Sequence, residues 1–365
     1  MTIARKILLG LAAPLLAFAV AAVVTSVVLV MAGDSPADFW QVLLSAPEAR
    51  NYVSIANSAA VLYLSGLAAA IGFRMNLFNI GVEGQYRVAT FAGAVFAGEA
   101  LLPGPLNTVA AILVAMAAGA LWAGIAAVLR VTRGVSEVIS TIMLNAIALS
   151  LVAYLLQKVG SRKGQTYVTD EIPESSWVPS FPLIPGESSE VYGLALLAVA
   201  AGIAFAVLLK RTRFGFDLRA TGQSESAAVA SGVDVKRMVL YAMLMSGAVA
   251  GLIGMPEILG ASHAYGSTIQ TGIGFTGIAV ALLGRNSPWG IAIGALIFAF
   301  LNQQASPLGI EAGISTEIIA VTQGVVVLSV VIAYEVVRRY STRLEQADVA
   351  RELRRQRGRD QEVTA

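Results

Sequence analysis

Long apolar runs separated by short polar stretches constrain this chain more than any other feature. The run Ile7–Met31 alone is long enough for a helix to cross the roughly 30 Å hydrocarbon core of a bilayer. Strands of a membrane barrel would instead alternate apolar and polar residues. We therefore expect an all-α integral membrane protein with about ten transmembrane helices, at approximately 7–31, 52–71, 79–101, 107–129, 137–157, 191–209, 237–258, 272–284, 289–305 and 315–337.

The composition fits a chain that lies largely in lipid and argues against an enzyme. Only 13% of the residues are charged, whereas soluble domains carry about 25%. The chain has no cysteine and a single histidine, His263, which excludes disulfides and thiolate sites and disfavours histidine-based metal or catalytic sites. It also has no phosphate-binding glycine-lysine loop and no nucleophile–base pair. We expect a transport protein that performs no catalysis itself.

The distribution of basic residues predicts the orientation. With the N-terminus inside, the predicted inner loops and tails hold twenty of the 25 Lys and Arg residues, and Arg87 lies within a span. The four in predicted outer loops are Arg50, Lys158, Arg162 and Lys163. Because basic residues accumulate on the cytoplasmic side, we expect both termini to be cytoplasmic. The first apolar run exceeds the length of a signal-peptide core and is expected to remain as the first helix.

The predicted transmembrane permease domain, residues 1–337, contains two polar loops and is followed by a polar tail. The outer loop 158–190 is rich in Pro, Ser and Gly and is expected to form an extended extracytoplasmic cap. The inner loop 210–237 holds small helix-compatible residues between Gly222 and Gly232 and predicts a short surface helix. A plain basic loop with a little local helix is the alternative. Residues 338–365 form a basic cytoplasmic tail, for which anionic lipids are the default partner.

The stretch GFRMNLFNIGVEGQYRVAT, residues 72–90, places polar groups among glycines between two spans. Glu83 and Arg87 are four residues apart, so they can meet on one helix face and neutralise each other. The other interpretation makes them part of a polar wall along a translocation path, because ionisable groups within spans usually serve a function. The predicted path residues in this stretch are Asn76, Asn79, Glu83 and Gln85.

A second polar, glycine-interrupted stretch occupies residues 256–290 and contains Glu257, His263, Tyr265 and Gln270. Two such breaks of opposite sense, one in each half, are typical of an inverted repeat with discontinuous helices. Phe275 is the predicted path residue here: its ring and that of Tyr265 are able to stack on a planar solute, and apolar packing is the default interpretation.

Four motifs occur in order along the chain: FNIGVEGQ (residues 78–85), GVSEVISTIMLNAIA (134–148), FGFDLRATGQSESAAVASGVDVKR (214–237) and FTGIAVALLGRNSPWG (275–290). Together they resemble the permease subunit of bacterial nucleoside-type ABC importers, within the ribose/branched-chain amino acid permease superfamily. FNIGVEGQ resembles the longer permease of the heterodimeric nucleoside system. Ribose permeases usually have an acidic residue where this chain has Phe78–Asn79, which disfavours a monosaccharide.

The resemblance implies a transport subunit of the bacterial plasma membrane that forms the path for nucleosides. Its implied partners are a cytoplasmic ABC ATPase, a second permease subunit, paralogous or identical, and an extracytoplasmic substrate-binding lipoprotein, with no nucleic acid. ATP and Mg would be bound by the ATPase, and this chain would hold no cofactor or metal. The inner loop 210–237 matches the family's coupling segment, whose implied ATPase contacts are Arg219, Gly222, Glu225, Ala227, Ala228, Gly232 and Arg237.

Three alternatives stay open at this stage. One is an ABC permease for simple sugars or other polar metabolites. Another is a gradient-driven secondary carrier, for which Glu83, Glu257 and Glu317 are the candidate titrating carboxylates. The last is a structural or signalling membrane scaffold, which predicts no transport.

Overall fold

The computed structural model describes residues 3–266, 269–315 and 317–363, and the chain divides into two compact units. The larger unit comprises residues 46–303 and contains both polar breaks and the predicted inner loop. The smaller unit combines residues 1–45 with residues 304–365.

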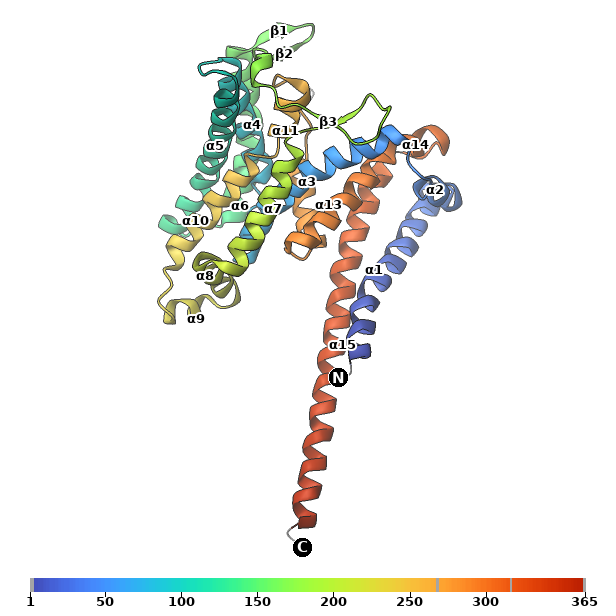
Figure 1. The fold of residues 1–365 in the computed structure, drawn as a ribbon. Helices are drawn as coiled ribbons and strands as arrows, with labels where there is room; N and C mark the ends of the chain where they lie inside the picture. The colour runs from blue at the N-terminus through green and yellow to red at the C-terminus, as the bar shows by residue number, and fades with distance from the viewer. Residues whose placement is uncertain (1–2, 267–268, 316, 364–365) are drawn as a thin grey trace. The chain divides into compact units, whose positions relative to one another are not determined.

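Helices form most of the larger unit (Figure 1). The main ones are α3 (Ala49–Arg74), α4 (Val82–Gly98), α5 (Gly104–Arg133), α6 (Glu137–Val159), α7 (Ala195–Arg211), α10 (Val235–Ala250), α12 (Ile273–Leu283) and α13 (Pro288–Gln303). The shorter ones are α8 (Arg213–Gln223), α9 (Glu225–Ala230), α11 (Met255–Glu257), the 3-10 turn η1 (Glu174–Ser176) and the π-helical turn η2 (Ile258–Ser262).

Helix α3 lies at the centre of the larger unit. It contacts α10, α12 and α13. In its most apolar stretch of 18 residues, 72% of the residues are buried, against 28% in α5 and 22% in α6. The second half of α3 has the sequence LSGLAAAIG, whose small residues let neighbouring helices approach closely. Because there is no hydrophobic driving force between helices in lipid, such close packing is what holds the bundle together.

One of the close helix–helix approaches joins α5 and α10. A Cβ atom at Gly119 would lie 2.3 Å from the Gly247 carbonyl oxygen, and a Cβ at Gly247 would lie 2.3 Å from the Gly119 oxygen. One turn further along, Gly251 meets the Ala115 carbonyl in the same way. Only glycine allows the two backbones to come this near.

The outer loop predicted at residues 158–190 contains two small antiparallel hairpins. β1 (Ser161–Lys163) pairs with β2 (Thr166–Val168), and β3 (Phe181–Pro182) pairs with β4 (Glu190–Val191). Between the hairpins, the loop backbone pairs with the second polar stretch: the Thr169 amide donates to the Tyr265 oxygen at 3.0 Å, and the Ile172 amide to the His263 oxygen at 2.8 Å. Trp177 stacks on the His263 ring with the ring centroids 3.7 Å apart.

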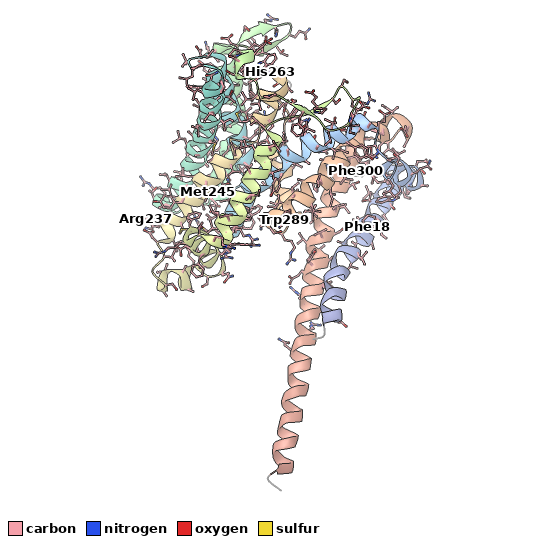
Figure 2. The ribbon with its side chains drawn as sticks, in the orientation of Figure 1. Phe18, Arg237, Met245, His263, Trp289 and Phe300 are labelled. Atoms are coloured by element: carbon pink, nitrogen blue, oxygen red, sulfur yellow. The ribbon has the colours of Figure 1, made fainter. Side chains whose placement is uncertain are left out.

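The predicted inner loop lies at the opposite end of the larger unit from the β1–β2 hairpin (Figure 1). Figure 2 shows the same separation between Arg237 and His263. Helix α8 turns away from α7 by 74°. Polar side chains cap the new helix starts: Thr212 Oγ1 accepts from the Gly215 amide, Ser224 Oγ from Ala227, and the Asp234 carboxylate from Arg237.

The structure is that of an all-α membrane protein, with seven helices long and apolar enough to cross a bilayer among the described residues. Each of the ten predicted spans coincides with a helix, but α4, α7 and α12 are not among these seven, and α4 and α7 have 17 residues each. Helix α12 has 11 residues, which is a rise of roughly 17 Å at 1.5 Å per residue. That is about half of the hydrocarbon core. Ten crossings and cytoplasmic termini stay predictions.

The smaller unit contains α1 (Ile3–Ala32), α2 (Pro36–Leu43), α14 (Ala305–Glu311) and α15 (Glu317–Val363). Helices α1 and α15 pack along each other. The buried Gln304 amide donates to the carbonyl oxygens of Val42 and Leu43, each at 3.1 Å, and so holds the turn after α2. The predicted basic tail continues the last apolar helix to Val363 without a break.

The α5–α10 contact generates a matched pair of glycine substitutions. Gly247→Ala places a methyl group against the α5 backbone, so we expect it to destabilise the protein by about 1–3 kcal/mol, as overpacking does. Gly324→Ala is the control, because Gly324 is exposed on α15 with nothing within 4 Å of the added carbon. Thermal unfolding in detergent measures both. Equal midpoints for the two variants would contradict the close contact.

Candidate functional site

The first break separates α3, which ends at Arg74, from α4, which begins at Val82. Asn76 adopts a left-handed backbone conformation with φ of 58°, and the Leu77 amide donates back to the Gly72 oxygen at 3.0 Å. Non-helical backbone at membrane depth requires internal hydrogen-bond partners. Side chains of Asn79 and Asn145 supply such partners.

Asn145 of α6 completes the backbone hydrogen bonds of the break. Its amide nitrogen donates to the Ile80 oxygen at 2.9 Å, and its amide oxygen accepts from the Gly84 nitrogen at 2.9 Å. One side chain thus replaces both a missing helical donor and a missing helical acceptor at the start of α4. The α6 motif that carries Asn145 is therefore tied directly to the first motif.

Asn79, Gln85 and Ser246 form a buried polar cluster behind the break. The amides of Asn79 and Gln85 exchange two hydrogen bonds of 3.1 and 2.9 Å. Asn79 also donates to Ser246 Oγ at 2.8 Å, and Ser246 donates in turn to the Ala68 oxygen of α3 at 2.6 Å. The cluster joins α3, α4 and α10 with each side chain engaged in hydrogen bonds.

Glu83 joins the two broken segments to each other. Its carboxylate accepts from Arg87 at 2.8 Å, one turn along α4, so the predicted pairing of these two side chains is confirmed. It also accepts from the backbone amides of Gly272 and Gly274 at 2.9 and 2.8 Å. These amides form the N-terminus of α12, where a carboxylate satisfies unpaired donors and interacts favourably with the helix dipole.

The start of α12 lies directly on the start of α4. A Cβ atom at Gly274 would lie 2.3 Å from the Glu83 amide nitrogen, so a larger residue would displace the helix. On the other side of α12, Ser65 of α3 donates from its hydroxyl to the Ile273 oxygen at 2.9 Å. Helix α12 is therefore fixed at its first residues by both α3 and α4.

The second break lies between Ser262 and Gly272, because α10, α11 and η2 together form one apolar segment, Val235–Ser262, and His263 then adopts a left-handed conformation with φ of 49°. Tyr86 of α4 donates to the Gln270 oxygen at 3.3 Å, which is another contact between the two breaks. Beside the outer loop, burial lowers the pKa of His263, and the Glu171 carboxylate partly opposes this shift. His263 therefore holds the stacked loop contact as a neutral ring at neutral pH.

The structure separates the predicted path residues into two groups. Asn79, Glu83 and Gln85 lie together in the interior, at most 5% exposed. Asn76 is exposed in the turn after α3, and Phe275 is 49% exposed on α12. Contact of any of these residues with a solute stays a prediction.

The predicted coupling residues also fall into groups. A groove of about 570 Å³ between α8, α9 and α10 is lined by Ala227, Ala228, Gly232 and Arg237, whereas Glu225 and Arg219 lie outside it. Gly222 faces inward: a Cβ atom there would lie 2.3 Å from the Arg74 oxygen, at the last turn of α3. Helix α8 therefore rests on the residue that precedes the first break.

Sequence reasoning missed Asn145, Ser246 and Ser65, which hold the breaks from neighbouring helices. Asn145 lies within a motif singled out by resemblance, and it is the one amide side chain in the apolar run of α6 before Gln157. This residue was a usable signal for a contact between helices, because an amide side chain within a span forms hydrogen bonds with neighbouring helices. Ser65 and Ser246 gave no signal, since serine is common in membrane helices.

Comparison with known proteins adds relatives across most of the chain. A model of the family described as "Branched-chain amino acid transport system / permease component" matches residues 51–333. The guanosine ABC transporter permease protein NupP of Bacillus subtilis (strain 168) is 38% identical over 75% of this chain and 78% of its own length.

Two further relatives cover more of the sequence. The glucose ABC transporter permease protein TsgB13 of Haloferax volcanii is 32% identical over 90% of this chain and 88% of its own length. The nucleoside ABC transporter permease protein NupB of Lactococcus lactis subsp. cremoris (strain MG1363) is 29% identical over 90% of this chain and 92% of its own length.

The Glu83 contacts generate a prediction that separates its two roles. Glu83→Ala leaves Arg87 and two amides of α12 without their acceptor, so we expect a loss of about 3–5 kcal/mol in stability. Glu83→Ala/Arg87→Ala should recover only part of it, because the α12 amides stay unpaired. Thermal unfolding in detergent measures each variant, with Glu99→Ala, an exposed position at the end of α4, as the control. Full recovery in the double variant would show that the helix cap contributes nothing.

Proposed function

The chain belongs to the family of permease components of branched-chain amino acid transport systems, and from this premise we propose that it forms the translocation path for nucleosides in an ABC importer. It is a multi-pass membrane protein and a transport subunit of an ABC transporter system, with no enzymatic activity of its own. We place it in the bacterial plasma membrane.

The substrate assignment is supported by two of the relatives, whose names specify guanosine and nucleosides. The motif FNIGVEGQ supports it as well, through its resemblance to the nucleoside branch. A sugar is the second candidate, because the Haloferax relative named for glucose is 32% identical over 90% of this chain. Both solutes are neutral and rich in hydroxyl groups.

For the architecture, we propose ten membrane segments with both termini in the cytoplasm. The short helices α4 and α12 then act as discontinuous segments, one in each half, that meet near the bilayer midplane through Glu83. Inverted repeats in transporters place discontinuous helices in this way. The opposite positions of the coupling segment and the β1–β2 hairpin in the larger unit fit one cytoplasmic and one outer end.

The observation that carries the mechanism is the contact of Gly222 with the last turn of α3. A cytoplasmic ATPase that moves α8 would push on Arg74 and Met75, and the first break starts at Met75. The break is joined to α10 through Ser246 and to α12 through Glu83. Closure of the ATPase would therefore move α3, α10 and α12 together, as in rigid-body transport cycles.

The groove between α8, α9 and α10 is the proposed ATPase docking surface. Phe216 and Tyr241 line it and are 62% and 51% exposed, which gives the surface large apolar anchors. Arg213 and Arg237 at its rim lie near Asp217 and Asp234, and exposed rim charges of this kind contribute little affinity individually. ATP and Mg would be bound by the ATPase.

The remaining proposed partners are a second permease subunit, which completes the path, and an extracytoplasmic lipoprotein that delivers the substrate. We propose a paralogous second permease, in line with the resemblance of FNIGVEGQ to the longer subunit of a heterodimeric pair. Nucleic acid has no part in this function.

Uptake measurements test the substrate. We expect cells that depend on this importer to take up a labelled nucleoside, and to lose that uptake when this chain and its second permease are deleted. Labelled glucose, measured in parallel, should enter at the same rate before and after the deletion. Nucleoside uptake that survives the deletion would refute the assignment, and loss of glucose uptake alone would favour the sugar permease.

Co-purification tests the docking surface. Ala227 and Ala230 are both exposed on α9, but only Ala227 lines the groove. We expect Ala227→Lys to lower the amount of ATPase that co-purifies with the permease by roughly tenfold or more, because a buried unpaired charge costs several kcal/mol. Ala230→Lys should retain the ATPase. Equal retention by both variants would contradict docking in the groove, and a permease that transports without any ATPase would be a secondary carrier.

A further inference from the structure

A polar cavity opens in the larger unit between α3, α12 and α13, beside α11. Its volume is about 630 Å³, within the range of small-molecule sites. It lies near β4, at the end of the unit that we propose to be outside. The polar side chains that line it include Asn57, Glu257, Gln270, Thr276, Asn302 and Gln303.

The position of these side chains on helices of the bundle indicates what surrounds them. Asn57 lies on α3, Thr276 on α12, and Asn302 with Gln303 on α13. Amide and carboxyl groups on such helices are costly to expose to hydrocarbon, so they face protein or a water-filled space. By contrast, the groove formed by Tyr63, Val199 and Trp289 is lined almost entirely by apolar residues and is compatible with lipid.

Glu257 distinguishes this cavity from the rest of the polar interior. Among the described residues, its half-buried carboxyl group has no hydrogen-bond donor and no ion-pair partner. The Glu83 carboxylate, in contrast, accepts from Arg87 and two backbone amides. A carboxyl group offers about four acceptor sites, so Glu257 keeps its acceptor capacity for a ligand.

The Asn57 side chain holds the backbone at the rim of the cavity through two hydrogen bonds. Its amide nitrogen donates to the Glu190 oxygen at 3.1 Å, and its amide oxygen accepts from the Tyr192 nitrogen at 2.9 Å. These bonds fix the chain between β4 and α7 on the outer end of α3. Tyr192 is thereby held as a lining residue of the cavity.

The polar groups that line the cavity fit a neutral ligand with several hydroxyl groups. None of the described lining residues is Lys, Arg or His, so nothing there would neutralise a phosphate or a carboxylate. A carboxyl group accepts two hydroxyl donors at once, which suits neighbouring hydroxyls on a ring. Amide and hydroxyl side chains such as Gln303 and Thr276 supply both donors and acceptors for the remaining polar groups.

We propose that this cavity is a substrate subsite of the permease, in which Glu257 accepts hydrogen bonds from the vicinal hydroxyls of a neutral solute. The proposal rests on the proposed function, under which the solute is a nucleoside and the hydroxyls belong to its ribose. A sugar shares the same hydroxyl chemistry. The subsite receives the solute at the outer end of the path, after delivery and before the broken segments.

Equilibrium binding tests the subsite on the assembled permease–ATPase complex in lipid nanodiscs, without the delivery protein. A labelled ribonucleoside is the probe, and the competitors are its 2′,3′-dideoxy analogue, ribose and glucose. We expect the dideoxy analogue to compete about tenfold more weakly than the ribonucleoside, because it lacks both hydroxyls. Stronger competition by glucose than by the ribonucleoside would identify a sugar as the ligand.

Glu257→Gln should weaken ribonucleoside binding about tenfold and abolish the difference between the ribonucleoside and its dideoxy analogue. Glu99→Gln is the same change at an exposed position and should leave both values unchanged. Basal ATP hydrolysis by each complex verifies that the variant is folded and assembled. Gln303→Leu provides a second variant, which should weaken binding without removing the preference for ribose hydroxyls.

The outcomes separate this inference from the proposed function. Unchanged affinity and selectivity in Glu257→Gln, or no binding to the wild-type complex at millimolar concentration, would overturn the subsite. Nucleoside uptake by the complete importer would still support the function in either case. Absence of uptake in the wild type would instead overturn the nucleoside assignment.

Discussion

The carboxylate of Glu83 is the interaction on which the arrangement of the larger unit depends. It accepts from one side chain of its own helix and from the first amides of α12, a helix almost two hundred residues later in the chain. A short helix that begins within a bundle has unpaired amides at its start, and membrane interiors supply no water to satisfy them. Glu83 accepts hydrogen bonds from these amides in α12, and Asn145 accepts one from the Gly84 amide in α4. The two breaks are therefore mutually supporting parts of one core.

The broad architecture could be predicted from the sequence because lipid imposes a simple rule on length and polarity. Each predicted span coincides with a helix, since an apolar run of sufficient length has no other stable conformation in a bilayer. Boundaries near the polar breaks were harder to place. The third predicted span began at residue 79, whereas α4 begins at Val82, because the Asn79 side chain bonds the Gly81 amide in a turn before the helix. Residues 1–45 and 304–365 form a separate compact unit, and nothing in the hydropathy pattern indicated that grouping.

The candidate site was only partly visible in the sequence, for a physical reason. The spacing of Glu83 and Arg87 predicted their ion pair, because four residues make one helical turn. The amides that bind Glu83 come from the other half of the chain, and backbone groups leave no trace in residue types. The polar cavity was missed for a different reason: Asn57 and Gln303 each look incidental within their own helix. Their association arises from the packing of α12 and α13 on α3, which no local pattern encodes.

The outer loop holds the second break through main-chain hydrogen bonds, such as Thr169 to Tyr265 and Ile172 to His263, together with the Thr169 hydroxyl, which accepts from the Tyr265 amide, and the Trp177–His263 stack. Main-chain pairing is nearly indifferent to side-chain identity, apart from proline. Loop residues other than Thr169 and Trp177 can therefore change without loosening the attachment of the loop to the second break. Under the proposed function, such a loop would acquire a new delivery protein by mutation of its remaining surface residues, so the specificity of docking and the mechanics of transport would diverge independently.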